Sequence, residues 1–168
     1  GFTHDGAIDG LVEFLRSPRF FFQGGDPQRA HVAAFLLTID TGAHAAVGAQ
    51  WTMGGGNEAA GRARVETLME VAELGSIGLV AKGNDLAGDA RGWVYGAGLF
   101  HPDRALESTS TLDDLLNIAA DGRELTFTGV YPGCETRLGI DRDLDGFLDR
   151  DEVDAGSDPG DPGSTPET

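Results

Sequence analysis

Residues 141–152 read Asp-Arg-Asp-Leu-Asp-Gly-Phe-Leu-Asp-Arg-Asp-Glu, and this acidic stretch is the most regular pattern in the chain. It matches the spacing D-x-[DN]-x-[DN]-G-x5-E at every constrained position. Carboxylates at alternate positions, a glycine at the sixth and a glutamate at the twelfth can wrap their oxygens around one cation. Calcium takes about six to eight oxygen ligands, so this spacing suits calcium. The pattern therefore predicts a calcium-binding loop at 141–156.

Each ligand has a predicted role that follows from its place in the loop. Asp141, Asp143 and Asp145 supply one carboxylate oxygen each. Gly146 allows a sharp turn, and Leu148 provides an apolar anchor. The remaining ligands are the backbone carbonyl of Phe147, the carboxylate of Asp149 directly or through a water, and both carboxylate oxygens of Glu152.

The stretch closely resembles an EF-hand calcium loop, but its flanks differ from those of a full EF-hand. Residues 132–140 contain a proline and two glycines, and they do not predict an entering helix. Gly156 predicts that the exiting helix is short. The similarity is therefore to single-loop calcium modules, such as dockerin-type and thrombospondin-type acidic repeats, in which the ion holds a loop in place.

This resemblance implies a protein that works outside the cytoplasm. A lone loop binds calcium weakly, at about 10⁻⁴–10⁻³ M. Such a site is filled only where calcium is abundant, which predicts a periplasmic or extracellular location. The alternative interpretation is that the stretch is an ordinary solvated acidic run.

The charge of the whole chain excludes several partners. Its 168 residues include 28 acids and 12 bases, a net charge of −16. Nucleic acids and anionic membranes bind clustered Lys and Arg, so neither is expected here. No apolar run approaches the roughly 18 residues of a transmembrane span. The single cysteine excludes an intrachain disulfide framework, a zinc site of several thiolates and haem attachment through C-x-x-C-H.

The first 47 residues predict a pair of helices. One helix starts at Asp5-Gly6 and ends at Pro18. The second starts at Asp26-Pro27, where Asp26 is the N-cap and proline the first helical residue. Its apolar stripe consists of Val32, Phe35, Leu36 and Ile39.

The rest of the chain predicts a small α+β domain at 50–140, followed by the calcium loop at 141–156. Helices are expected at 57–74 and at 112–120, the second capped by Thr111 or Ser110. Strands are expected around 77–81, 93–100 and 125–130, because apolar and polar residues alternate there. They form a small antiparallel sheet. The acidic segment 157–168 has no apolar residue to bury, so it is expected to be a mobile tail. The predicted fold class is α+β.

The first residues carry a second resemblance. The segment Gly1-Phe2-Thr3-His4-Asp5-Gly6, with Ala34-Phe35-Leu36-Leu37 further on, is similar to F-x-H-D-G…L…F-L near the end of cytochrome-c domains in bacterial dihaem peroxidase-like proteins. The resemblance implies the C-terminal part of a longer secreted polypeptide, with haem c on a missing segment or a partner chain. Since the chain begins without methionine, we interpret it as a processed product or part of a longer protein. His4 is either close to that haem or a helix-entry residue.

Stretches between residues 61 and 159 are similar to a C-terminal module of large secreted bacterial proteins. They are Ala90-Arg91-Gly92-Trp93, Glu124-Leu125-Thr126-Phe127-Thr128, residues 137–143 and residues 156–159. This similarity favours a secreted, calcium-bearing protein and implies no activity.

Other chemistry-bearing residues form no recognisable catalytic constellation, so the sequence favours a protein that is not an enzyme. His31, His44 and His101 lack zinc-site spacing. Cys134 is interpreted as a partly buried small residue or a free thiol. Three aromatic residues suit either a sugar site or a core: Trp51, Trp93 and Tyr95.

Three functions remain open. The first is an extracytoplasmic calcium-binding structural or interaction module, with a protein partner or a segment of its parent polypeptide. The second is a haem-less fragment or accessory subunit of a c-type cytochrome or peroxidase-like electron-transfer assembly. The third is a polysaccharide hydrolase with a structural calcium ion. The oligomeric state is left open.

Overall fold

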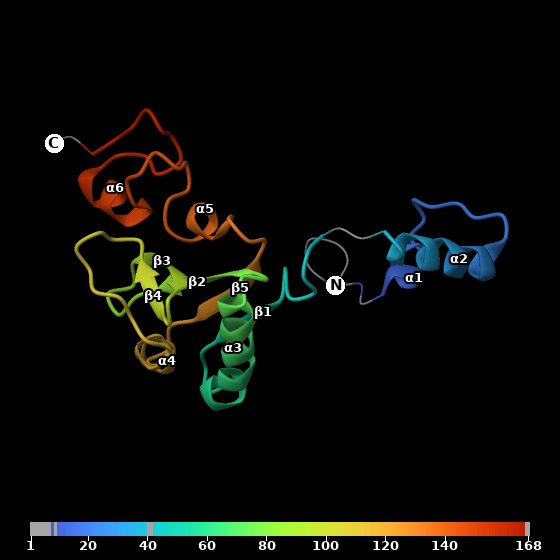
Figure 1. Cartoon of the computed structure of the whole chain (residues 1–168), viewed down its shortest axis with the longest axis horizontal. Coiled ribbons are helices and arrows are strands. Elements are labelled where there is room, and N and C mark those ends of the chain that lie inside the picture. Colours follow the sequence, from blue (N-terminus) through green and yellow to red (C-terminus); the bar gives the residue numbers. More distant parts are fainter. Residues whose placement is uncertain (1–7, 9, 40–41, 167–168) are drawn as a thin grey trace. The chain divides into compact units, whose positions relative to one another are not determined.

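The computed structural model describes residue 8 and residues 10–39 and 42–166. The chain divides into two compact units, Gly1–Gly42 and Ala43–Thr168. The described residues form six helices and a five-stranded antiparallel sheet, so the predicted α+β class is confirmed (Figure 1). None of the described helices is both long and apolar enough to cross a bilayer.

Among its described residues, the first unit contains two helices, α1 (Leu11–Phe14) and α2 (Gly25–Leu37). Helix α1 is much shorter than predicted, because Gly10 is extended and the helix begins only at Leu11 rather than at Asp5-Gly6. The predicted N-cap, Asp26, does not cap α2, because the helix begins at Gly25, two residues before the predicted start at Pro27. Its N-cap is Gly24, whose N–H donates to Oε1 of Gln28 at 2.8 Å. Asp26 instead joins the two helices by accepting from Arg16 at 3.1 Å and from Arg29 at 2.8 Å.

The apolar stripe of α2 is largely exposed. Phe35 and Leu36 keep 67% and 39% of their surface accessible, and the only described residue of α2 that is buried is Ala33. The short α1 covers little of its neighbour. Helical spacing alone therefore predicted where the stripe lies but not what covers it.

The second unit is built on a sheet with the order β1-β5-β2-β3-β4, in which all neighbours are antiparallel. The central strands are β5 (Leu125–Val130), β2 (Gly78–Asn84) and β3 (Ala90–Gly96). The edge strands are β4 (Leu99–Pro102) and β1 (Gln50–Met53). The sequence did not predict β1, which has four residues and is held by pairing with β5, as in Trp51↔Phe127.

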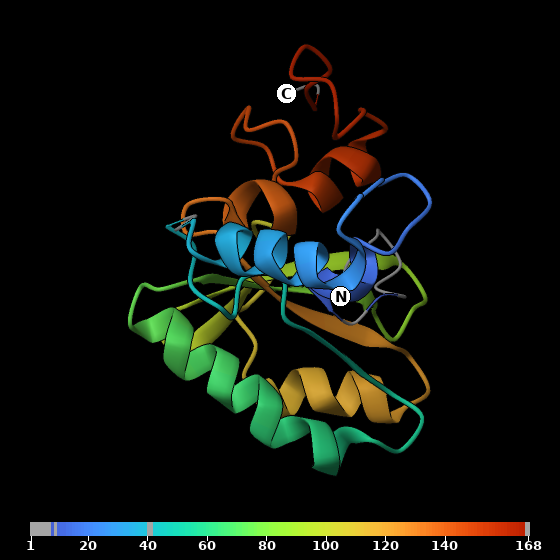
Figure 2. The ribbon, with the colours of Figure 1, turned by 90° about the vertical axis from the view of Figure 1, so that its right-hand side faces the viewer.

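Two helices cover one face of this sheet, α3 (Glu58–Glu73) and α4 (Leu112–Ala120) (Figure 2). Thr111 caps α4 in a capping box with Asp114, so of the two predicted caps the threonine is the one used. The core lies between these helices and the sheet and includes Val65, Leu115, Trp93, Tyr95, Phe100 and Phe127. Trp93 and Tyr95 are thus core residues.

Two short helices lie on the opposite face, α5 (Glu135–Gly139) and α6 (Asp149–Ala155) (Figures 1 and 2). The prediction that no helix precedes the loop was wrong, since α5 forms within 132–140. Its last residue, Gly139, lies directly against β3. A Cβ on Gly92 would collide with the carbonyl oxygen of Gly139, and a Cβ on Gly139 would collide with Val94. Two glycines thus allow the start of the acidic loop to sit on the sheet.

Candidate metal centre

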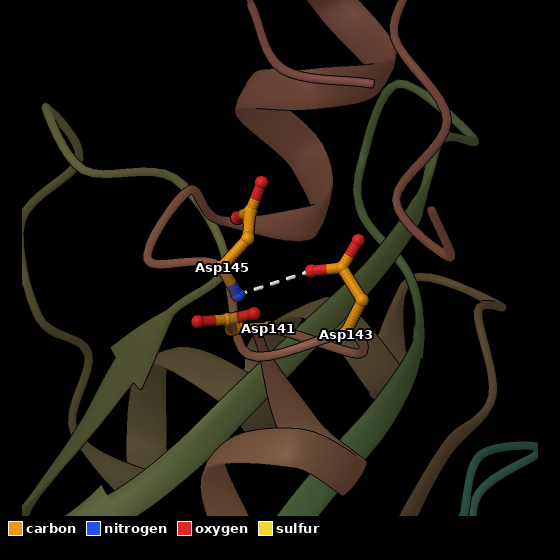
Figure 3. Close-up of side chains that lie close together, drawn as sticks. All are labelled: Asp141, Asp143 and Asp145. Carbon is orange, nitrogen blue, oxygen red and sulfur yellow. Dashed lines mark hydrogen bonds between the residues drawn. The ribbon is translucent and has the colours of Figure 1, made fainter. Parts of the chain in front are cut away.

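The loop between α5 and α6 gathers three aspartates. One carboxylate oxygen each of Asp141, Asp143 and Asp145 lies within 4.8 Å of the others, a spacing that could hold a metal ion (Figure 3). Asp141 is buried and the other two are partly buried. Like charges brought this close repel one another unless a cation or a proton lies among them.

Backbone amides of the loop set the orientation of these carboxylates. Asp141 accepts from the N–H groups of Leu144 and Gly146, at 2.7 and 3.3 Å. Asp143 accepts from the N–H of Asp145 at 3.2 Å, as Figure 3 shows. Asp145 accepts from the N–H of Phe147 at 2.8 Å. In both Asp143 and Asp145 the second oxygen, Oδ2, is buried and has no hydrogen-bond partner among the described residues.

The loop needs two residues in the left-handed region of backbone space. Gly146 has φ +97°, which glycine adopts at no steric cost, as the motif requires. Leu144 has φ +65°, which is uncommon for a residue with a Cβ. Nothing in the sequence pattern indicated that Leu144 would adopt this conformation. The hydrogen bond from its backbone N–H to Asp141 helps to hold it there.

Glu152 lies in α6 with 0% of its surface exposed. Neither of its carboxylate oxygens has a hydrogen-bond partner in the described part of the chain. Burial, and then the charges of the four loop aspartates, together raise the pKa of Glu152 to about 7; in order of effect these aspartates are Asp145, Asp143, Asp149 and Asp141. A buried carboxylate without a hydrogen-bond partner is costly, and a cation bound to it would offset that cost.

The two other predicted ligands have different surroundings. The Oδ1 atom of Asp149 accepts from the N–H of Arg142 at 2.7 Å. Its Oδ2 atom lies 3.7 Å from the guanidinium of Arg142 and 3.9 Å from Nζ of Lys82. Phe147 has a partly exposed side chain and donates its N–H to Asp145.

Hydrogen bonds attach the loop and α6 to the sheet. The N–H of Asp149 donates to the carbonyl of Ile140 at 2.8 Å and closes the loop. The N–H of Arg150 donates to the carbonyl of Asp103, just after β4, at 3.0 Å. Asp151 accepts from the N–H of Ala105 at 2.8 Å. A cation in the loop would therefore act on a segment that is already docked on the sheet.

The helix that follows the loop is short, as predicted. Helix α6 is short and ends at Gly156, which has φ +83°. Beyond it, residues 157–166 form turns without a helix or strand. In these turns Asp158 accepts from the N–H of Gly160, and Asp161 accepts from the N–H of Gly163, both at 3.0 Å.

The remaining candidate residues are not brought to this site. His4 lies outside the described residues. His44 accepts from the N–H of Ala46 at 3.1 Å, and His101 lies 3.2 Å from the carbonyl of Gly96. Cys134 is an exposed free thiol. Trp51 stacks under the guanidinium of Arg64, whose central carbon lies 4.3 Å from the ring centre.

One buried charge cluster was missed by the sequence analysis. Arg91 is buried and donates to Asp103 at 2.7 Å, to Glu107 at 2.8 Å and to Asp85 at 3.3 Å. Burial raises the pKa of Asp103, although its hydrogen bond with Arg91 opposes that shift. No motif could have indicated this cluster, because the tertiary structure alone brings its members together.

The chain matches no protein-family model, no curated protein and no solved structure. No family is therefore identified, and the resemblances rest on the quoted motifs alone. Haem is not supported by these comparisons or by the described residues. The acidic cluster at Asp141, Asp143 and Asp145 is the feature that the geometry supports.

Proposed function

We propose that the loop at 141–152 binds calcium and that the ion locks the C-terminal segment onto the sheet. The observation that carries this proposal is the carboxylate of Glu152, which is fully buried and unpaired beside three clustered aspartates. It occupies the twelfth loop position, where calcium loops place a glutamate that binds through both oxygens. Calcium suits the proposed ligands, which are the carboxylates of Asp141, Asp143 and Asp145, the carbonyl of Phe147 and both carboxylate oxygens of Glu152. Asp149 would act through a water, since its carboxylate is engaged by Arg142.

Charge balance favours a divalent cation over a proton or a nearby base. Five carboxylates of the loop act on one another: those of Asp141, Asp143, Asp145, Asp149 and Glu152. The cations nearest to them, Lys82 and Arg142, both lie beside Asp149. Calcium accepts more and less regular oxygen ligands than magnesium, so it fits a flexible loop with a bidentate glutamate.

The role that we propose for the ion is structural. The loop connects α5, which lies against β3, to α6, which is hydrogen bonded to the segment after β4. An ion that binds only the folded loop stabilises the fold of which the loop is a part. Because a lone loop binds weakly, the site would be filled in calcium-rich surroundings, which supports a periplasmic or extracellular module.

The interaction role of this module is proposed from the first unit. The side chains of Phe21, Phe35, Leu37 and Ile39 are more than half exposed there. Large apolar side chains that are left exposed can be buried by contact with another protein. A protein partner, or a segment of a parent polypeptide, would provide that contact.

The calcium site is tested by Glu152→Gln, with Glu70→Gln as the matched control. Glu70 is exposed on α3 and makes no side-chain hydrogen bond within the described residues. Melting temperatures are measured in calcium, in magnesium and in excess EGTA. With calcium about tenfold above its dissociation constant, wild type should gain about 4 °C, whereas magnesium should have little effect.

Glu152→Gln should lose the calcium-dependent gain, and Glu70→Gln should keep it. The same substitution removes a buried charge that four aspartates repel. In EGTA the variant should therefore melt at or above the temperature of wild type. An unchanged calcium response in Glu152→Gln would show that the loop is not the binding site.

A further inference from the structure

A cavity of about 330 Å³ lies beside the acidic loop, between the sheet and α6. Four basic residues line it: Lys82 from β2, Arg91 from β3, Arg142 from the loop and Arg150 from α6. The chain has only 12 basic residues and a net charge of −16. One third of its positive side chains thus line a single cavity.

Two of these cations are held by neighbouring carboxylates. Arg91 is buried and paired with Asp103, Glu107 and Asp85. The guanidinium of Arg150 lies 2.6 Å from Asp154 and 3.3 Å from Asp89. These pairs keep part of the cavity wall in place. The Nε atom of Arg150 is nevertheless buried without an acceptor among the described residues.

Lys82 and Arg142 are paired with fewer carboxylates than the other two cations. Within the described residues the only ion-pair partner of either is Asp149, at 3.9 and 3.7 Å. Both distances are longer than a hydrogen bond. Both side chains are also considerably exposed, at 43% and 59%. Lys82 and Arg142 therefore share one carboxylate, so this pair, unlike Arg91 and Arg150, has more positive than negative charge.

We propose that this cavity binds a small organic oxyanion, with its carboxylate or phosphate group between Lys82 and Arg142. Ammonium and guanidinium groups are the side chains that best bind such oxygens. Val153 and Pro159 also line the cavity and can contact a short apolar body. The volume is at the lower end of the range of about 300–1,000 Å³ for ligand pockets, so a small molecule fits it.

The inference rests in part on the proposed function, because two residues of the cavity belong to the calcium loop. Arg142 follows the first loop aspartate, and Asp149 is at the ninth position. An ion that holds the loop folded also holds these residues beside Lys82. Calcium and the oxyanion should therefore strengthen each other's binding.

The test is calorimetric titration of the full chain with sulfate, benzoate and phenyl phosphate, in calcium and in EGTA. Sulfate offers a head group alone, whereas the other two add an apolar ring to a carboxylate or a phosphate. The variants are Lys82→Gln and Arg142→Gln. Arg19→Gln is the matched control, because Arg19 lies in the other unit and carries the same charge. Calcium binding is measured on each sample by the same method.

In calcium we expect saturable binding of at least one ring-bearing probe, stronger than that of sulfate. The probe that binds more tightly identifies the head group. Lys82→Gln and Arg142→Gln should each weaken it about tenfold, the loss expected from one charge-assisted hydrogen bond. Arg19→Gln should leave the affinity unchanged.

Two results would overturn the cavity assignment and leave the calcium site standing. One is intact calcium binding with no saturable binding of any probe. The other is an equal loss of affinity in Arg19→Gln, which would mean that only the overall charge matters. Anion binding that depends on Lys82, in a chain that binds no calcium, would keep the cavity and overturn the calcium proposal instead.

Discussion

At the scale of single residues, burial sets the chemistry of two titratable side chains, Glu152 and Tyr95. Glu152 is buried without a hydrogen-bond donor, and this makes its carboxylate the observation on which the proposed calcium site rests. Tyr95 is the contrasting case, because its buried hydroxyl has an acceptor within the protein. It donates to Oε1 of Glu73 at 2.6 Å and so ties β3 to α3. An unpaired group points to a ligand, and a paired one to a structural role.

The hydrogen bond of Tyr95 predicts a loss of stability in alkali. Burial, then the hydrogen bond to Glu73 and the charge of that carboxylate, raise the pKa of Tyr95 from 10.0 to about 12. The folded state thus holds this proton more tightly than the unfolded state. The stabilisation is complete below pH 10 and is lost as the pH rises towards 12.

Tyr95→Phe should remove this part of the alkaline transition, measured as the free energy of unfolding in urea between pH 8 and 12. At pH 8 the variant should be less stable by about 1.5–3 kcal/mol, the usual value of a hydrogen bond to a charged group. Tyr131→Phe is the control, because Tyr131 is 49% exposed. Parallel pH profiles for wild type and Tyr95→Phe would contradict the prediction.

At the scale of elements, the acidic loop depends on the close contact between α5 and β3. Gly92 and Gly139 meet where any side chain would collide with backbone or with Val94. The contact places the first loop aspartate two residues beyond Gly139. Sheet and loop are therefore parts of one packing arrangement, although their sequences lie about 50 residues apart.

This contact predicts that Gly92→Ala is strongly destabilising. Its new Cβ would collide with the carbonyl of Gly139, so α5 must move away from β3. We expect a loss of about 2–4 kcal/mol in unfolding free energy, as for other overpacked sites, and weaker calcium binding. Chemical denaturation and calcium titration measure the two effects.

Gly96→Ala is the control from the same strand. A Cβ there would meet only the ring of His101 at an ordinary 3.8 Å, so the change should cost little. Equal effects of the two substitutions would show that loss of glycine in β3, rather than the contact with α5, is responsible.

At the scale of the whole molecule, the chain consists of two compact units. The first keeps an exposed apolar surface, and the second contains the sheet, the acidic loop and the cavity. All described contacts of the loop fall within the second unit. The calcium response should therefore belong to that unit.

A chain of residues 43–168 should fold by itself and show the same calcium-dependent rise in melting temperature as the full chain. Its core, capped helices and complete sheet are all present. Thermal unfolding with calcium and with EGTA measures this. A truncated chain that no longer responds to calcium would show that the first unit contributes to the site.

Local patterns were enough to predict much of this molecule. The cluster of aspartates in the acidic loop and the turn at Gly146 could be predicted because each constraint lies within a few residues of the next. The bounds of α4, the short α6 and the antiparallel sheet followed from capping, Gly156 and alternation in the same way. These features depend on backbone geometry and on the nearest neighbours, which the sequence contains directly.

Only the tertiary structure decided the rest, because it depends on contacts between distant residues. Strand β1 exists by pairing with β5, and α5 forms where Gly139 meets Gly92. The burial of Glu152 and the cavity between Lys82 and Arg142 likewise require the loop to lie on the sheet. The sequence by itself determined the spacing of the acidic residues in the loop. Packing determined which of them are left without a partner, since burial is a property of the whole fold.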